Sequence, residues 1–205
     1  MKIDLHVHTK EYSLCGRSNA EEQIQAAMTA GLDALVFADH DHLFPPAHLR
    51  MLNDKYAPFK IFGGIELTES TGEHILVLGV HDPALEQGRW AYADLYQFVR
   101  ERGGFMALNH PFRFVPEIEI EYEHFPLDAL EAYSNNISPS WAPRILKLAN
   151  ELDVNILSNS DAHRAVDVGR YYNELEETPA TEHELIALLQ ARKFSCIFPQ
   201  RQRPQ

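Results

Sequence analysis

Short apolar runs alternate along this chain with amphipathic segments, and most of these runs end in a histidine or a carboxylate. Runs this short and apolar are typical of parallel strands that are buried on both faces. Strands that alternate with helices predict an α/β fold with a parallel sheet, and about seven such units predict a closed barrel related to the TIM fold. An open doubly wound sheet is the alternative. We expect strands at residues 2–9, 34–38, 60–67, 74–80, 105–109, 129–133, 154–158 and 194–198.

The segments between these strands carry helix signals. Ser18 or Asn19 is expected to cap the first helix, and Gly31 is expected to end it. Residues 114–126 are expected to form a loop or a small hairpin over the site. An edge strand within this segment is the alternative. No Gly-x-Gly-x-x-Gly follows the first strand, so a dinucleotide site has no support. We expect helices at residues 19–31, 46–56, 90–102, 141–152 and 181–192.

Length and net charge limit the classes of partner. At 205 residues the chain suits one domain, expected at residues 1–198, with a loose tail at 199–205. The net charge of −12 disfavours long nucleic acids, because an acidic surface repels a phosphate backbone, so a small molecule fits better. The chain has no apolar run of about 18 residues and no apolar signal region, which predicts no membrane span and a cytoplasmic location. The oligomeric state stays open.

Two histidines on the first strand present their side chains to one point. Side chains alternate faces along a strand, so His6 and His8 project the same way. Neutral imidazoles held on one strand are good ligands for a borderline metal ion. Cys15 and Cys196 form no Cys-x-x-Cys pair, so we expect a metal to use histidines and carboxylates. Further candidates fall at the C-terminal ends of expected strands, where barrels of this type carry their chemistry: His40, Glu66, His110, Asp161 and His163.

These candidates belong to motifs that extend over nearly the whole chain: Asp4-Leu-His-Val-His-Thr9, Ala38-Asp-His40, Gly64-Ile-Glu66, Gly72-Glu-His-Ile-Leu-Val-Leu-Gly79, Asn109-His-Pro-Phe-Arg113 and Ser160-Asp-Ala-His163. As a set they resemble the motifs of the PHP family, the polymerase and histidinol phosphatase metalloesterases, in its small stand-alone form. The resemblance implies a distorted (β/α)7 TIM-like barrel with two or three divalent ions, zinc, manganese or iron, at the barrel mouth. It also implies the ligands of each ion: His6, His8, Glu66 and Asp161 for the first, Glu66 with His110 and His74 for the second, and His40 with His163 for the third.

The sequence departs from the family pattern in the loop after the first strand. Many members carry an aspartate or a histidine there, whereas this chain reads Glu11-Tyr-Ser-Leu-Cys15. Glu11 and Cys15 are the candidate substitutes. A second choice stays open between His74 and His81, because either position holds the ligand in different relatives.

The ligand chemistry agrees with the resemblance. Mixed histidine and carboxylate ligands suit borderline divalent metals, and a bridging carboxylate holds two ions about 3.5–4 Å apart. A water between the ions ionises near neutral pH, and the resulting hydroxide attacks phosphorus in line. We expect Glu66, Asp161 and His163 to be catalytic. Arg113 and Arg170 are expected to bind phosphate oxygens, with Arg17 and Arg164 as further candidates and a surface salt bridge as the alternative for each.

The predicted function is therefore a metal-dependent phosphoesterase that hydrolyses a small phosphorylated metabolite or a nucleotide. One alternative is an amidohydrolase-like enzyme, which also begins with His-x-His on a barrel strand but would use a bridging carboxylated lysine or another ligand order. The other alternative is a metal-binding PHP module without catalysis. The sequence leaves open the substrate, the choice between monoester and diester, and the physiological metal.

Overall fold

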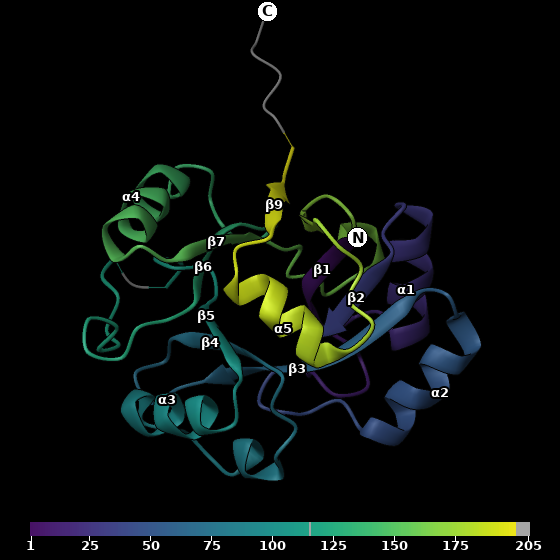
Figure 1. Cartoon of the computed structure of the whole chain (residues 1–205), viewed down its shortest axis with the longest axis horizontal. Helices are drawn as coiled ribbons and strands as arrows, with labels where there is room; N and C mark the ends of the chain where they lie inside the picture. The colour runs from purple at the N-terminus through teal and green to yellow at the C-terminus, as the bar shows by residue number, and fades with distance from the viewer. Residues whose placement is uncertain (115, 200–205) are drawn as a thin grey trace, which may run out of the picture.

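The computed structural model of the chain describes residues 1–114 and 116–199. Its strands and helices alternate as expected, with one strand more than the sequence predicted (Figure 1). Residues 200–205 of the expected tail lie outside the described residues. The elements are β1 (Lys2–Val7), α1 (Ala20–Thr29), β2 (Ala34–Phe37), α2 (Pro46–Tyr56), β3 (Lys60–Thr68), β4 (His74–Leu78), η1 (Pro83–Glu86), α3 (Tyr92–Glu101), β5 (Phe105–Leu108), β6 (Ala129–Tyr133), α4 (Ala142–Leu152), β7 (Asn155–Ser158), η2 (Ala165–Asp167), β8 (Tyr172–Leu175), α5 (Glu182–Gln190) and β9 (Phe194–Ile197).

The strands form one sheet in the order β7-β6-β5-β4-β3-β2-β1-β8-β9. β1, β2 and β3 are parallel, and so are β5, β6 and β7. The prediction of a wholly parallel sheet is wrong, because β4 runs antiparallel to both β3 and β5. Only residues 69–73 join β3 to β4, and a parallel crossover needs a dozen or more residues.

The sheet curls into a nearly closed barrel, which confirms the predicted barrel-type α/β fold and excludes the open doubly wound alternative. The strand that the sequence did not predict, β8, pairs antiparallel with β1 and β9. Side chains join the two ends of the sheet. Asn173 Nδ2 donates to the main-chain oxygen of Ser158 at 2.9 Å, and the main-chain nitrogen of Leu5 donates to Asn159 Oδ1 at 3.3 Å. Hydrogen bonds of polar side chains therefore connect the two ends of the sheet, where no continuous backbone pairing does so among the described residues.

Alternate residues of each strand pack on different sides of the barrel wall. In β2, Ala34 and Val36 belong to the interior cluster, whereas Leu35 and Phe37 pack outward with residues of α1 and α2. The interior cluster also contains Leu185, Ile186, Leu188 and Leu189 of α5, which lies across the ring of strands in Figure 1. α5 thereby closes one end of the barrel, and the other end is left for the site.

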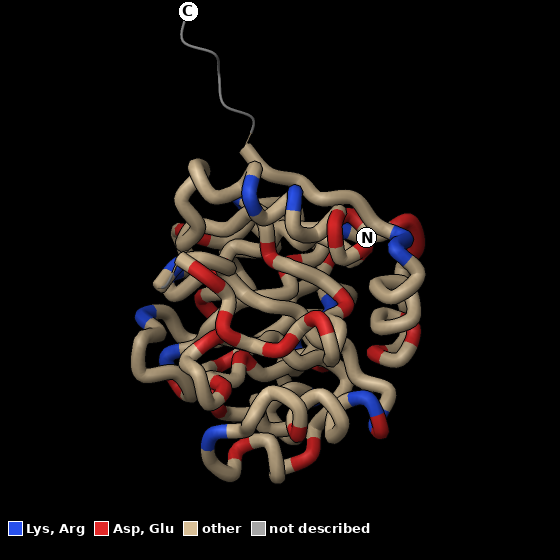
Figure 2. The backbone as a smooth tube through the Cα atoms, turned by 90° about the vertical axis from the view of Figure 1, so that its left-hand side faces the viewer, with Lys and Arg blue, Asp and Glu red and all other residues tan. Residues whose placement is uncertain are grey.

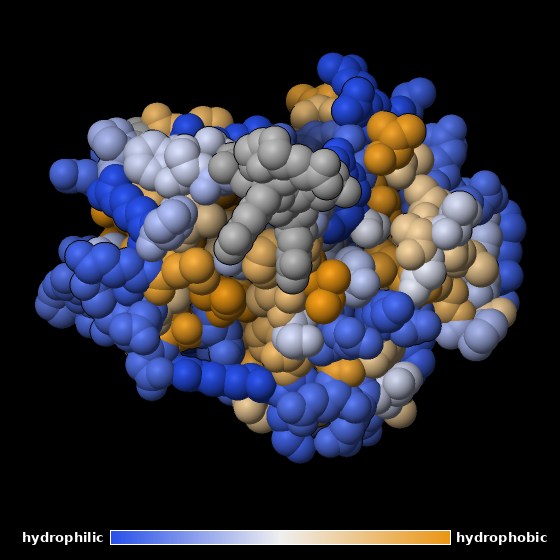
Figure 3. Space-filling model, turned by 90° about the horizontal axis from the view of Figure 1, so that it is seen from above, coloured by the Kyte–Doolittle hydropathy of each residue, from blue (hydrophilic) through white to orange (hydrophobic). Residues whose placement is uncertain are grey.

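The remaining helices cover the outside of the barrel. Asn19 caps α1 through a reciprocal pair of hydrogen bonds with Glu22, which decides between the two predicted caps. The described part of residues 114–126 forms no strand, so the edge strand is not found there. Seen from above, the surface mixes exposed hydrophobic residues with hydrophilic ones (Figure 3). None of the described helices is both long and apolar enough to cross a membrane.

Candidate metal centre

The candidate ligands meet at the open end of the barrel, because they lie near the C-terminal ends of β1, β2, β3, β5 and β7, in the turns that follow, or at the first residue of the antiparallel strand β4. Two of these turns have unusual backbones. His110 has φ of 31° and Asp161 has φ of 49°, in the left-handed region that residues with a Cβ rarely adopt. Such strain costs about 1–3 kcal/mol per residue and gathers at functional sites, where it fixes the direction of a side chain.

The innermost group consists of His6, His8, Glu66 and Asp161, all of them buried. One ligand atom from each lies within 4.8 Å of the other three. Nε2 of His6 lies 3.0 Å from Nε2 of His8 and 3.2 Å from Oε2 of Glu66. Oδ1 of Asp161 lies 3.1 Å from Nε2 of His8. Lone pairs of two imidazoles and two carboxylates converge here away from the protein surface, an arrangement that is costly unless a cation lies among them.

The two carboxylate oxygens of Glu66 face different sets of imidazoles. Oε2 lies 3.2 Å from both His6 and His8, and it has no hydrogen-bond partner among the described residues. Oε1 lies 3.2 Å from Nδ1 of His74 and 3.1 Å from Nε2 of His110. A carboxylate with ligands on both of its oxygens has the arrangement of a bridge between two metal positions. The donor set and the unpartnered buried oxygen therefore fit divalent ions.

A third group lies nearer the surface. Ligand atoms of His8, Cys15, His40 and His163 lie within 4.8 Å of one another. The ring of His8 lies between those of His40 and His163, with centroid distances of 4.6 Å and 4.3 Å. His40 also reaches the first group, since its Nδ1 lies 3.1 Å from Oε2 of Glu66.

The two open choices in the sequence have clear geometric answers. Glu11 lies outside the third group, because its carboxylate accepts hydrogen bonds from the main-chain nitrogen of Ala20 at 3.1 and 3.2 Å. His81 also lies outside the site, since its Nε2 lies 2.7 Å from Oε2 of Glu182 in α5, at the opposite end of the barrel. His74, by contrast, contacts Glu66 within the site.

Several buried polar residues orient these imidazoles, and sequence reasoning missed two of them. Glu131 Oε1 lies 3.1 Å from Nδ1 of His6, and Asn109 Nδ2 donates to Oε1 of Glu66 at 2.9 Å. A carboxylate inside the apolar run 129–133 was the available signal for Glu131, because a lone buried charge requires a partner.

Asp39 is linked to His8 through the hydroxyl of Ser13. Ser13 Oγ donates to Oδ1 of Asp39 at 2.7 Å and lies 3.3 Å from Nδ1 of His8. The main-chain nitrogen of His40 donates to the same hydroxyl at 2.9 Å. With Nδ1 of His8 donating to Ser13, its Nε2 keeps a free lone pair toward the first group.

Opposite charges dominate the electrostatics of the first group. Burial alone lowers the pKa of His8, but its close contacts with the carboxylates of Asp161 and Glu66 outweigh burial and raise the pKa to about 9. Burial likewise lowers the pKa of His6, yet the charges of Glu66, Asp161 and Glu131 raise it well above the usual value. Both carboxylates thus require positive charge beside them, which two buried protons or one divalent ion can supply.

His40 and His163 are in a different electrostatic environment. Burial lowers the pKa of His40 to about 3 and is also the main cause of the lowered pKa of His163. Both imidazoles are therefore neutral at physiological pH. Neutral imidazole is the form that coordinates a metal ion.

A cavity of about 570 Å³ opens beside the third group. Arg113 and Arg170, the predicted phosphate-binding residues, both line it, and Nη1 of Arg113 lies 3.4 Å from Oδ2 of Asp161. Arg164 is paired with Asp167, at 2.9 Å between Nε and Oδ2. The cavity lining is Cys15, Arg17, Arg113, Asn135, Asn136, Asp161, His163, Arg164, Asp167 and Arg170.

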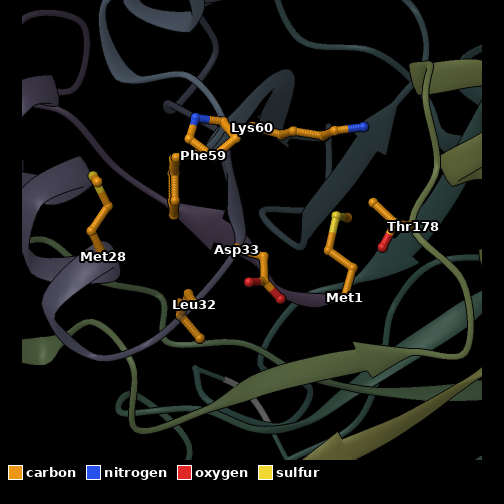
Figure 4. Close-up of a pocket in the computed structure, with 8 residues that line it drawn as sticks. Met1, Met28, Leu32, Asp33, Phe59, Lys60 and Thr178 are labelled. Atoms are coloured by element: carbon orange, nitrogen blue, oxygen red, sulfur yellow. The ribbon is translucent and has the colours of Figure 1, made fainter.

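Another cavity, of about 440 Å³, lies at the opposite end of the barrel (Figure 4). Met1, Phe59 and Lys60 line it, at or next to the N-terminal ends of β1 and β3. Its carboxylate, Asp33, already accepts a hydrogen bond from the main-chain nitrogen of Lys2 at 2.8 Å. No candidate metal group lies there among the described residues, so the candidate centre is at the open end of the barrel.

Two family models match parts of this chain. A family model described as PHP-associated matches residues 139–194, a segment that contains Asp161 and His163. A second model, of a family of unknown function (DUF6282), matches residues 2–88. The first match supports the resemblance to the PHP family that the sequence motifs carry. No curated protein matches this chain.

Solved structures share the fold of this chain at low identity. PsfC from Pseudomonas syringae is 19% identical with a TM-score of 0.70, and the match covers 97% of this chain and 91% of PsfC. A two-domain protein from Bacteroides vulgatus, described as containing a predicted PHP-like metal-dependent phosphoesterase, is 15% identical with a TM-score of 0.71. That match covers 97% of this chain but only 64% of the two-domain protein. An amidohydrolase from Chromobacterium violaceum with bound sulfate is 17% identical with a TM-score of 0.67, covering 98% of this chain and 99% of that one.

Proposed function

We propose that this protein is a metal-dependent phosphoesterase that hydrolyses a small phosphorylated metabolite or a nucleotide. The observation that carries the proposal is the position of Glu66, whose two oxygens face two separate sets of histidines within 3.2 Å. A structural carboxylate would be satisfied by one partner on each oxygen. The surplus of imidazoles around one buried carboxylate supports a bridged pair of ions.

The proposed ligands follow from the three groups of the candidate centre. His6, His8, Glu66 and Asp161 would hold one ion, and Glu66, His74 and His110 a second. His40 and His163 would contribute to a third. When bound, such ions lower the pKa of a coordinated water and neutralise charge on the phosphoryl oxygens. Zinc, manganese and iron all suit this mixture of imidazole and carboxylate ligands.

Residues of the cavity wall would bind and position the phosphate. Arg113 and Arg170 would hold the non-bridging oxygens of the phosphate by bidentate hydrogen bonds. The contact of Arg113 with Asp161 fixes the guanidinium beside the proposed ligands, so a phosphate bound there lies next to the centre. Asn136 Nδ2 donates to Oδ2 of Asp161 at 2.7 Å, which leaves Oδ1 of Asp161 directed at His8.

The size of the cavity and the overall charge support a small substrate. A volume of about 570 Å³ is in the range of small-molecule sites. The chain carries 30 acidic and 18 basic residues, and the acidic ones are spread over the backbone (Figure 2). A long nucleic acid would meet repulsion from most of this surface, whereas a small phosphate ester needs only the local arginines.

The test compares bound metal and hydrolysis in two matched variants. Glu66→Gln keeps the size of the side chain but removes the charge, and Glu182→Gln makes the same change in a histidine-bound glutamate at the other end of the barrel. After loading with zinc or manganese, each protein is assayed for ions per chain and for hydrolysis of p-nitrophenyl phosphate and bis-p-nitrophenyl phosphate. We expect at least two ions and ester hydrolysis in the wild type and in Glu182→Gln. Both should be lost in Glu66→Gln.

The same assay separates the alternatives. An amidohydrolase would cleave amide or lactone substrates in preference to both phosphate esters. No lysine lines the cavity beside the centre, and Lys60 donates from Nζ to the main chain of Pro179 at the other end of the barrel, so a bridging carboxylated lysine has no support. A protein that binds ions but hydrolyses nothing would be a metal-binding module. Equal activity in wild type and Glu66→Gln would refute the role of Glu66.

A further inference from the structure

The loop between β1 and α1 is tightly folded and fastened to the turn that carries His163. Gly16 N donates to the main-chain oxygen of Ser13 at 3.0 Å, and a Cβ at Gly16 would lie 2.3 Å from the main-chain oxygen of Thr9. Arg17 N donates to the main-chain oxygen of His163 at 2.8 Å. A residue larger than glycine has no room at position 16, so the loop path that places Cys15 beside His163 depends on it.

Cys15 faces inward from this loop. Its neighbour Leu14 is fully exposed, whereas Cys15 is half-buried and lines the cavity beside His163. The Cys15 sulfur and one ring nitrogen each of His40 and His163 lie within 4.8 Å of one another. That spacing brings three ligand atoms around one point, as in metal sites that keep a fourth position open.

The hydrogen bonds of the two histidines prepare them as ligands. Nδ1 of His163 lies 3.0 Å from the main-chain oxygen of Asp161, an acceptor only, so Nδ1 carries the proton and Nε2 keeps its lone pair. Nδ1 of His40 faces the first group, at 3.1 Å from Oε2 of Glu66.

We propose that Cys15, His40 and His163 form a thiolate-containing metal site that selects a thiophilic ion such as zinc. The proposal rests on the proposed function in that the site belongs to the same metal centre. When the metal–sulfur bond forms, the Cys15 thiol gives up its proton to solvent, so the site takes up one divalent ion and releases one proton. Thiolate is softer than imidazole or carboxylate and favours zinc and cobalt over manganese or magnesium. The centre would then hold zinc here even where the Glu66 sites are filled with manganese.

The position of this site gives the ion a direct relation to the substrate. Cys15 and His163 line the cavity, and so do the proposed phosphate-binding residues Arg113 and Arg170. The open fourth position of a three-ligand site would therefore face the cavity. An ion held there would lie beside a phosphate bound by these arginines.

The test uses cobalt as a spectroscopic probe, because a cobalt–thiolate bond gives a charge-transfer absorption band in the near ultraviolet. The full-length protein is loaded with Co²⁺, and the band and the ions per chain are measured for wild type, Cys15→Ser and Cys196→Ser. Cys196 is the matched control, since its Sγ lies 3.2 Å from the main-chain oxygen of Ile156 and burial raises its pKa to about 12. We expect the band in wild type and Cys196→Ser. It should be absent in Cys15→Ser, which should bind one ion fewer per chain.

A second variant distinguishes loss of the ligand in Cys15→Ser from misfolding of that variant. Cys15→His replaces the thiolate by another ligand, so it should restore the lost ion without restoring the band. No band in the wild type, or an unchanged band in Cys15→Ser, would overturn the proposal. The outcome is independent of the proposed function: ester hydrolysis that depends on Glu66 without a thiolate band refutes the Cys15 site alone. A thiolate band without any ester hydrolysis refutes the phosphoesterase and leaves the Cys15 site standing.

Discussion

Glu131 orients two of the proposed metal ligands, and its substitution should have a measurable effect on metal binding. It is fully buried in β6, and its two oxygens accept from opposite sides. Oε1 lies 3.1 Å from Nδ1 of His6 and 3.0 Å from Nδ2 of Asn159, and Oε2 accepts from the main-chain nitrogen of His110 at 3.2 Å. The carboxylate therefore holds two proposed ligands that serve different ions.

Glu131→Gln keeps the shape of this side chain but turns one acceptor oxygen into a donor. The amide must face either the His110 nitrogen or the pair formed by His6 and Asn159, so at least one of these hydrogen bonds is replaced by two opposed donors. Loss of such an orienting partner costs about 10- to 100-fold in metal affinity or activity. That range corresponds to about 1.4–2.7 kcal/mol, at about 1.36 kcal/mol for each factor of ten.

The assay is competition between the protein and a chelator for zinc, with kcat/KM for p-nitrophenyl phosphate as the second readout. Glu177→Gln is the control, because Glu177 is an exposed residue paired only with Lys193 at 3.2 Å. We expect weaker zinc binding and lower kcat/KM in Glu131→Gln alone, with the fold retained in circular dichroism spectra. Zinc affinity within about twofold of the wild type would refute the argument that Glu131 orients His6.

The other predictions concern His74 and His81, the two histidines between which the sequence left the choice of ligand open. His74→Ala should lose one ion per chain and at least about tenfold in kcat/KM, whereas His81→Ala should change neither, and the reverse pattern would move the second metal position to His81. Glu182 raises the pKa of His81 above its usual value through their hydrogen bond, so their contact stabilises the fold below about pH 6.5 and this contribution is lost as the pH rises through the raised pKa. Thermal melts should therefore show that Glu182→Gln lowers Tm more at about pH 6 than at about pH 9, and an equal loss at both would show that the charge of His81 does not matter.

Much of this fold follows from local sequence. The short apolar runs and the helix signals predicted all five α-helices of the described chain and every strand of its sheet except β8. The missed strand, Tyr172–Leu175, alternates buried and exposed residues over only four positions and pairs at the edge of β1, so its structure depends on long-range pairing. The direction of β4 also depends on tertiary context, although the five-residue connection before it was a readable signal.

The sequence by itself determined the residue types of the centre and their place at strand ends, because the carboxyl ends of parallel strands must meet at one end of a barrel. It left open the choice between His74 and His81, although the motif spacing favours His74, and the choice between Glu11 and Cys15. Only the tertiary structure decided these choices, because the antiparallel turn of β4 places His74 against Glu66 and the tight loop at Gly16 directs Cys15 toward His163. Other contacts of the centre join segments far apart in the chain, such as His8 and Asp161, which are separated by 153 positions, and local patterns carry no record of such contacts.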